Sequence, residues 1–112
     1  MTTIIKPTVG RKVWYRPSAY DLMGPVPMCG STAPGAQPLD ATIIAVWGDR
    51  MVNVLVTDSM GKQFPVLSVT LLQAGDEPPK DAEGNIAGRY VEWMPYQQGQ
   101  AAKTEATEKA SQ

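Results

Sequence analysis

The sequence contains no histidine, and this absence removes several kinds of catalysis at once. Ser-His-Asp and Cys-His nucleophilic catalysis depend on an imidazole base, and many zinc sites depend on an imidazole ligand. The single cysteine, Cys29, lies between Met28 and Gly30 in a proline-rich stretch. Cys29 would need a nearby cation to lower its pKa before it could act as a nucleophile, so we interpret it as a spectator thiol.

Carboxylates could still act as acids and bases or bind calcium, and the only dense acidic stretch runs from Asp76 to Glu83. The glycine of the segment Asp81-Ala-Glu-Gly-Asn comes too early for an EF-hand, so the stretch is interpreted as a solvated loop. Neither Gly-x-Gly-x-x-Gly nor Gly-x-x-x-x-Gly-Lys-Ser/Thr occurs, which argues against nucleotide hydrolysis. We therefore predict no catalytic residue, no metal site, no cofactor and no enzymatic activity.

The remaining candidates are aromatic and cationic side chains, which dominate binding hot spots. Neighbouring residues of a strand point to opposite faces, so about half of the rings must belong to the core of a small barrel. Trp47 and Trp93 are assigned to the core, and one of Trp14 and Tyr15 is expected to be exposed. Tyr20 and Tyr96 each lie beside a proline or a loop and are the better surface candidates. The predicted binding residues are Arg11, Trp14, Tyr15, Arg16, Tyr20, Arg50 and Tyr96.

The overall charge is nearly balanced, with 10 Lys and Arg against 11 Asp and Glu and a net charge of -1. This balance argues against long nucleic acids and anionic membranes as partners, although local cations could hold a small anion. A single cysteine cannot form an internal disulfide, the first residues lack the pattern of a signal peptide, and no apolar run is long enough to span a membrane. We expect a cytoplasmic protein that makes no membrane contact.

The elements that must position these side chains are expected to be short strands separated by turns. Residues 11–16 predict a strand, and residues 17–40 predict a long irregular loop that could contain an edge strand or a helical turn. Residues 41–57 predict a hairpin with a type II′ turn at Gly48-Asp49. On its second strand, alternation places three valines toward the core, namely Val52, Val54 and Val56.

A second turn at residues 58–61 leads into a strand over residues 63–73, in which Pro65 marks an edge or a bulge. Alternation in this strand places three residues on one face, namely Leu67, Val69 and Leu71. Residues 74–88 predict a loop, and residues 90–93 predict the last short strand. The domain plan is an N-terminal arm over 1–8, a barrel over 9–96 and a disordered or weakly helical tail over 97–112.

Five short strands, a long first loop and two tight turns predict a single all-β domain, a small SH3-like barrel. An OB-like barrel or a small sandwich is the alternative. A sandwich usually has about seven strands, which this chain could supply only by using its loops.

Several short blocks of the chain resemble a group of small proteins encoded by tailed phages and prophages. The resemblance covers most of residues 6–97 and depends on the order and spacing of five blocks: Lys6-Pro7-Thr8-Val9-Gly10-Arg11, Trp14-Tyr15, residues 41–55, Ser68-Val69 and Trp93-Met94-Pro95-Tyr96-Gln97. It implies a phage origin and a barrel fold. It implies no activity, because no activity has been agreed for the members of this group.

Three functional hypotheses follow. The first is a non-enzymatic binding module that engages a host or phage protein through the long first loop and its neighbouring aromatics. The second is a virion component, such as a decoration or tail-associated protein, whose polar tail orders on the assembled lattice. The third is a binder of a small anionic ligand, including a nucleotide signal of host defence, which would use Arg11, Lys12, Arg16 and the rings. Self-association is also open, and the expected location is the cytoplasm of the infected host cell or the virion.

Overall fold

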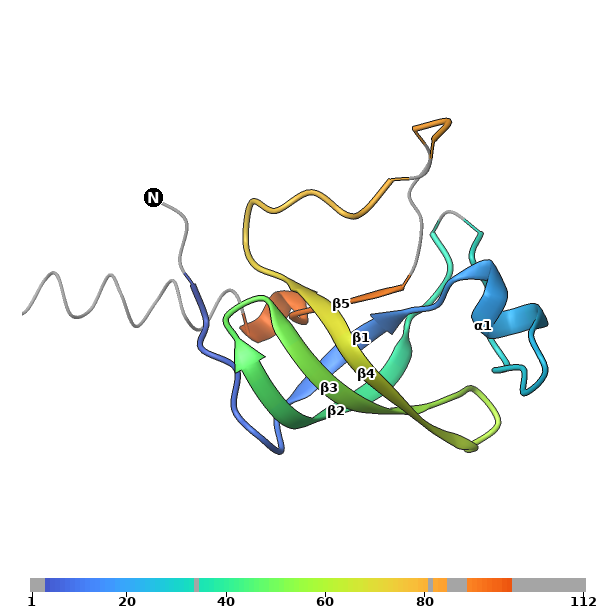
Figure 1. Ribbon diagram of the computed structural model, residues 1–112, viewed down its shortest axis with the longest axis horizontal. Helices are drawn as coiled ribbons and strands as arrows, with labels where there is room; N and C mark the ends of the chain where they lie inside the picture. Colours follow the sequence, from blue (N-terminus) through green and yellow to red (C-terminus); the bar gives the residue numbers. More distant parts are fainter. Residues whose placement is uncertain (1–3, 34, 81, 85–88, 98–112) are drawn as a thin grey trace, which may run out of the picture.

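Five strands form a closed barrel in the computed structural model, which describes residues 4–33, 35–80, 82–84 and 89–97 (Figure 1). One short helix, α1 (Ala19–Met23), lies in the long first loop, and residues 95–97 form a further helical turn. Within the described residues, none of the helices is long and apolar enough to cross a membrane. The strands are β1 (Lys12–Arg16), β2 (Leu39–Gly48), β3 (Met51–Thr57), β4 (Gln63–Leu72) and β5 (Tyr90–Glu92).

Each strand pairs with the next one along the chain, and the first four pair in antiparallel fashion. The last strand, β5, closes the barrel by antiparallel pairing with β1 and by parallel pairing with β4 at Leu71 and Leu72. This consecutive order fits an SH3-like barrel, whereas an OB fold is a Greek-key barrel. The prediction of a small five-stranded all-β barrel is confirmed, and the OB-like and sandwich alternatives are wrong.

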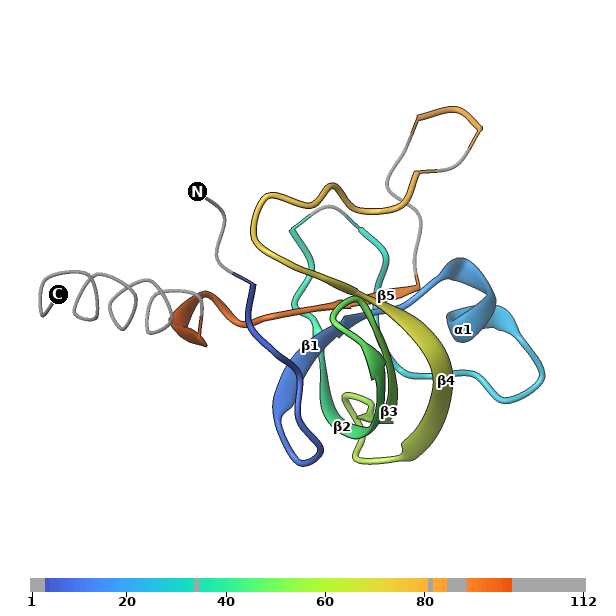
Figure 2. The ribbon, with the colours of Figure 1, turned by 60° about the vertical axis from the view of Figure 1, so that its left-hand side comes forward.

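The core follows the alternation of the strands, with β1 burying Val13 and Tyr15 and leaving Trp14 partly exposed on the outside. The predicted inward face of β3 is confirmed, because its three valines are fully buried. Trp93 is also buried, as predicted, and is the largest fully buried side chain among the described residues. Figure 2 shows the strands forming the barrel, with α1 beside β4.

The hairpin between β2 and β3 differs from the prediction at its turn. Gly48 pairs with Met51, so Asp49 and Arg50 are the two turn residues, and Gly48 does not have the positive φ that a type II′ turn needs there. The predicted turn is therefore wrong. The reason is that β2 contains two register shifts, which leave Ile44 and Trp47 without a paired residue on β3.

A third bulge lies in β4, where Ser68 adopts a positive φ of 52° and the register with β3 shifts. An extra residue reverses which side chains point inward. Phe64 and Val66 are buried before the bulge and Val69 after it, while Leu67 is exposed. The predicted shared face of Leu67, Val69 and Leu71 is therefore wrong for Leu67.

Replacing Ser68 by glycine is expected to raise the free energy of unfolding by about 0.5–1 kcal/mol. The left-handed conformation costs an L-residue about 1–2 kcal/mol, and the extra chain entropy of glycine offsets only part of this gain. Urea denaturation measures the change. The matched control is Thr70→Gly in the same strand, which is expected to destabilise the protein by about the same amount. A Ser68→Gly variant as destabilised as the control would contradict the assignment of strain.

The long first loop contains a helical turn, one of the two structures that its length predicted. Ser18 caps α1 by accepting a hydrogen bond from the backbone N–H of Asp21, whose carboxylate accepts one from the backbone N–H of Ser18.

In the N-terminal arm, Ile5 and Pro7 are buried against the barrel. The prediction for the tail over 97–112 lies outside the described residues beyond Gln97. Pro65 lies in the part of β4 that pairs with β3 alone, which confirms its predicted edge position.

Candidate functional site

A groove of about 250 Å³ separates the first loop from β4. Its floor consists of Met28, Phe64 and Val66, which are buried side chains of the core. Two of its wall residues are largely exposed, since Tyr20 and Val26 keep 67% and 59% of their surface accessible. Other residues complete the lining, namely Asp21, Gly24, Pro25, Pro65 and Arg89. The groove therefore offers an apolar surface with one cationic group at its side.

The wall formed by α1 is held tightly at Gly24. The backbone N–H of Gly24 donates a hydrogen bond to the carbonyl oxygen of Tyr20 at 2.8 Å. A Cβ atom at Gly24 would approach that oxygen to 2.7 Å and the Tyr20 ring to 3.4 Å. Because that approach is too close for any side chain, glycine is required for the exit from α1 that forms this wall.

A buried carboxylate, Asp21, anchors the groove to the barrel. It accepts hydrogen bonds from the hydroxyl of Tyr15, from the backbone N–H of Ser18 and from the Nη2 group of Arg89 at 2.7 Å. Burial, together with the hydrogen bond to Asp21, raises the pKa of Tyr15 far above its ordinary value. Tyr15 therefore remains a hydrogen-bond donor at every physiological pH, and it ties α1 to β1.

Arg89 is the cationic group of the groove, and its side chain is 40% exposed. One of its N–H groups bonds Asp21, and the guanidinium makes no further hydrogen bond to the part of the chain that the structure describes. Arginine presents several N–H donors in a planar fork that suits a carboxylate. Arg89 could therefore bind a second carboxylate while Asp21 fixes its orientation.

The structure brings only one of the predicted binding residues, Tyr20, into this groove. Tyr15 is completely buried, so its predicted role as a binding residue is corrected to a supporting one through Asp21. The reason is the alternation of β1, which turns Tyr15 inward and Trp14 outward. Tyr96 is exposed, as predicted, but it follows β5 and is not among the residues that line the groove.

The predicted cations of β1 are engaged with neighbouring side chains. Arg16 lies over the ring of Trp14 and pairs with Glu92 at 3.2 Å. Lys12 pairs with Asp40 at 3.0 Å. Carboxylates therefore neutralise much of the platform that the small-anion hypothesis requires on β1.

The two remaining arginines of the prediction lie apart from the groove. Arg50 lies in the β2–β3 turn and pairs with Asp76 at 2.8 Å. Arg11 lies over the ring of Trp93, with its guanidinium carbon 5.8 Å from the ring centroid. Neither residue is among those that line the groove.

Two groups of surface residues were missed by the sequence-based assignment. The first is Arg89, which is 68 residues from Asp21 in the sequence, so no local pattern signals their contact. The second centres on Trp47, which was assigned to the core and is in fact 65% exposed. The bulge in β2 turns Trp47 outward, where its Nε1 donates to the Oδ1 of Asn53 at 3.0 Å. The unbroken apolar run over residues 43–47 was the available signal, because a strand with one buried face should alternate.

Asp58 fastens the first loop to the β3–β4 turn. Its carboxylate accepts hydrogen bonds from the backbone N–H groups of Cys29, Met60 and Lys62. The bond from Cys29, followed by those from Lys62 and Met60, lowers the pKa of Asp58 below its ordinary value. The stability that Asp58 contributes is therefore complete above the ordinary pKa of an aspartate and is lost as the pH falls through the lower folded pKa.

The Asp58→Asn variant is expected to be less stable than the wild type at pH 6, and the difference should narrow as the pH falls toward 2. Urea denaturation at a series of pH values measures the two free energies of unfolding. A difference that stays constant over this range would show that the charge of Asp58 does not couple to folding.

Metal ligands do not gather anywhere in the described part of the chain, where no group of three or more histidine, cysteine, aspartate or glutamate residues could hold an ion. Cys29 is exposed and forms no disulfide.

Compared with known proteins, the chain matches no family model, no curated protein and no solved structure.

Proposed function

We propose that this protein is a non-enzymatic binding module that holds a short extended segment of a host or phage protein in the groove between α1 and β4. The observation that carries the proposal is the groove itself, which has an apolar floor, an exposed tyrosine and two prolines in its walls, and an arginine at its side. Grooves lined by aromatic side chains accept extended, proline-rich segments, whose low conformational entropy favours binding. The phage origin implied by the sequence resemblance supports a host or phage protein as the source of the segment.

The size of the groove favours a peptide over a small molecule. Pockets for small ligands enclose about 300–1,000 Å³ and bury most of the ligand. A groove of about 250 Å³ accommodates one or two apolar side chains and leaves the rest of a bound segment in solvent. Specificity would then come from the apolar anchor and from its immediate neighbours.

Arg89 supplies the second element of specificity. With its orientation fixed by Asp21 and its side chain 40% exposed, it favours an acidic residue next to the apolar anchor. Preorganisation lowers the entropy lost on binding, because Tyr15, Ser18 and Asp21 already hold α1 against the barrel.

A random-peptide display library selected on the purified protein tests this function. The enriched peptides are expected to share a proline or another apolar residue followed or preceded by an acidic one. The Tyr20→Ala variant should bind a selected peptide at least tenfold more weakly, because Tyr20 is an exposed aromatic wall of the groove. Fluorescence anisotropy of the labelled peptide measures the affinity.

The matched control is Tyr96→Ala, which removes a tyrosine of similar exposure away from the groove and should leave the affinity unchanged. A peptide in which the acidic residue is replaced by the corresponding amide residue, asparagine or glutamine, should bind the wild-type protein more weakly. This comparison tests the role of Arg89 without altering the protein. A library that yields no enriched sequence, or a Tyr20→Ala variant that binds as well as the wild type, would refute the proposed function.

A further inference from the structure

The edge of β4 that borders the groove is not paired with another described strand over residues 63–67. One edge of β4 pairs with β3, whereas its other edge meets β5 only at Leu71 and Leu72. Phe64 and Val66 are buried side chains of the core, yet both line the groove. A side chain that points into a barrel can line an open groove only where the wall of the barrel is open. The groove therefore runs along the free edge of β4, and α1 lies beside β4 as its other wall (Figure 2).

The pairing of β4 with β3 determines where the backbone groups of this edge point. Proline has no N–H, so Pro65 and its partner on β3 form a pair without mutual hydrogen bonds, and the bonds lie at the pairs on either side. The backbone N–H of Asp58 donates to the carbonyl oxygen of Lys62 at 2.9 Å, which fits the same alternation. The N–H and C=O groups of Phe64 and Val66 therefore point toward β3.

The backbone groups of the intervening residues point away from β3. Because a trans peptide directs its C=O and N–H to opposite sides, the N–H of Leu67 and the C=O of Pro65 face the free edge. The C=O of Leu67 also does so, because the N–H of Ser68 donates to the Oδ1 of Asn53 on β3 at 2.7 Å. By the same geometry the N–H and C=O of Gln63 face this edge. Gln63, Pro65 and Leu67 are exposed, and these backbone groups make no hydrogen bond to another described residue.

A free strand edge beside an apolar groove suits one further extended segment. Added strands bind through main-chain hydrogen bonds, and pockets for alternate side chains supply specificity. The edge of a second folded sheet is a poor fit, because its next strand, about 4.8 Å behind, would meet the wall formed by α1. The Arg89 guanidinium, held by Asp21 at 2.7 Å, adds charge complementarity to a segment that carries a carboxylate.

We propose that the target segment binds as a β-strand added to the free edge of β4, so that its main chain is recognised together with its side chains. This inference rests on the proposed function of the groove and specifies how the segment lies there. Pro65 makes the edge selective, because it offers a carbonyl oxygen but no N–H. The segment residue that donates to the carbonyl oxygen of Pro65 therefore cannot be a proline.

Replacing single backbone amides of a selected peptide by esters tests the added strand. An ester has nearly the shape of an amide but no N–H. At every second residue, where the N–H faces β4, the replacement should weaken binding about tenfold, because it removes a hydrogen bond. The residues in between are the matched controls, and their esters should bind within about twofold of the parent peptide. Fluorescence anisotropy measures the affinities.

Hydrogen exchange at the amide of Leu67 gives a second readout on the protein itself. Because this N–H makes no hydrogen bond to a described residue, it should exchange rapidly in the free protein. Saturation with the selected peptide should slow its exchange at least about tenfold, because the N–H then donates to the added strand. A peptide of the same composition in scrambled order is the control and should leave the rate unchanged.

The results separate this inference from the function on which it rests. A peptide that needs Tyr20 but tolerates an ester at every position, or leaves exchange at Leu67 unchanged, would overturn the added strand and keep the groove as a binding site. Failure to select any peptide that needs Tyr20 would overturn both.

Discussion

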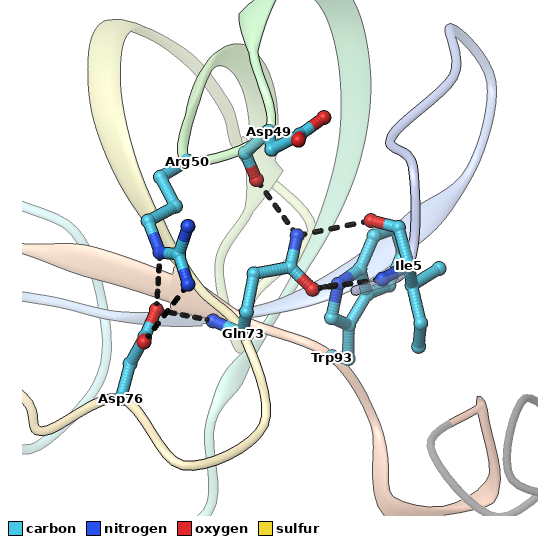
Figure 3. A network of polar contacts seen from close by, with 6 residues as sticks. All are labelled: Ile5, Asp49, Arg50, Gln73, Asp76 and Trp93. Carbon is cyan, nitrogen blue, oxygen red and sulfur yellow. Dashed lines mark hydrogen bonds and ion pairs between the residues drawn. The ribbon is translucent and has the colours of Figure 1, made fainter. Parts of the chain in front are cut away.

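The Gln73→Leu variant is expected to lower the free energy of unfolding by about 3–5 kcal/mol, the largest effect expected of any single substitution proposed for this protein. Gln73 is 2% exposed and lies at the end of β4. Its Nε2 donates hydrogen bonds to the carbonyl oxygens of Ile5 and Asp49 at 2.9 and 2.7 Å (Figure 3). Its Oε1 accepts hydrogen bonds from the backbone N–H of Ile5 and from the Nε1 of Trp93 at 3.0 and 3.2 Å.

Leucine has a similar volume but no polar group, so four protein groups would lose their partner together. A buried donor or acceptor without a partner costs about 1–3 kcal/mol. The N-terminal segment can relieve part of this cost by leaving the barrel, since Ile5 is held there by two of the four bonds. The expected total is therefore smaller than the sum of four full penalties.

Urea denaturation followed by circular dichroism measures the loss, and hydrogen exchange at the amide of Ile5 reports whether the N-terminal segment is released. The control is Gln63→Leu, which changes an exposed glutamine at the start of the same strand and should alter stability by no more than about 0.5 kcal/mol. Equal stability of the two variants would mean that Gln73 does not hold these elements together.

The Asp21→Asn variant is expected to lower the free energy of unfolding by about 2–3 kcal/mol and to weaken peptide binding in the groove. The Asp21 side chain is 4% exposed and accepts hydrogen bonds from Tyr15, Ser18 and Arg89. Asparagine keeps the shape but replaces one acceptor oxygen by a donor, so at least one of these donors faces another donor. Breaking a buried ion pair costs about 3–5 kcal/mol, and solvent at the half-exposed Arg89 reduces that figure.

Chemical denaturation of the variant measures the stability, and titration with a selected peptide measures the groove. Asp40→Asn is the matched control, because it breaks an exposed pair with Lys12 and should cost less than about 1 kcal/mol. A double-mutant cycle with Arg89→Gln isolates the contribution of the Asp21–Arg89 pair. If the cycle shows no coupling, Asp21 does not orient Arg89, and the basis for an acidic residue in the target segment fails.

The sequence by itself determined the strands and the class of fold. Alternation over residues 11–16 and 51–57 is a local property, so it correctly predicted β1, β3 and the buried faces of Val52, Val54 and Val56. Glycines and prolines marked the turns and the long first loop. The exposure of Tyr20 and Tyr96 was predictable for the same reason, because each lies next to a chain feature that keeps it out of a strand.

The tertiary structure alone decided which outward residues form surfaces and which polar residues hold the barrel together. Trp47 and Leu67 were misassigned because a bulge depends on the register with a neighbouring strand, which period-two alternation within one strand does not contain. Gln73 and the Asp21–Arg89 pair act through contacts between residues 20 to 68 positions apart, which only the closing of the barrel brings within hydrogen-bonding distance.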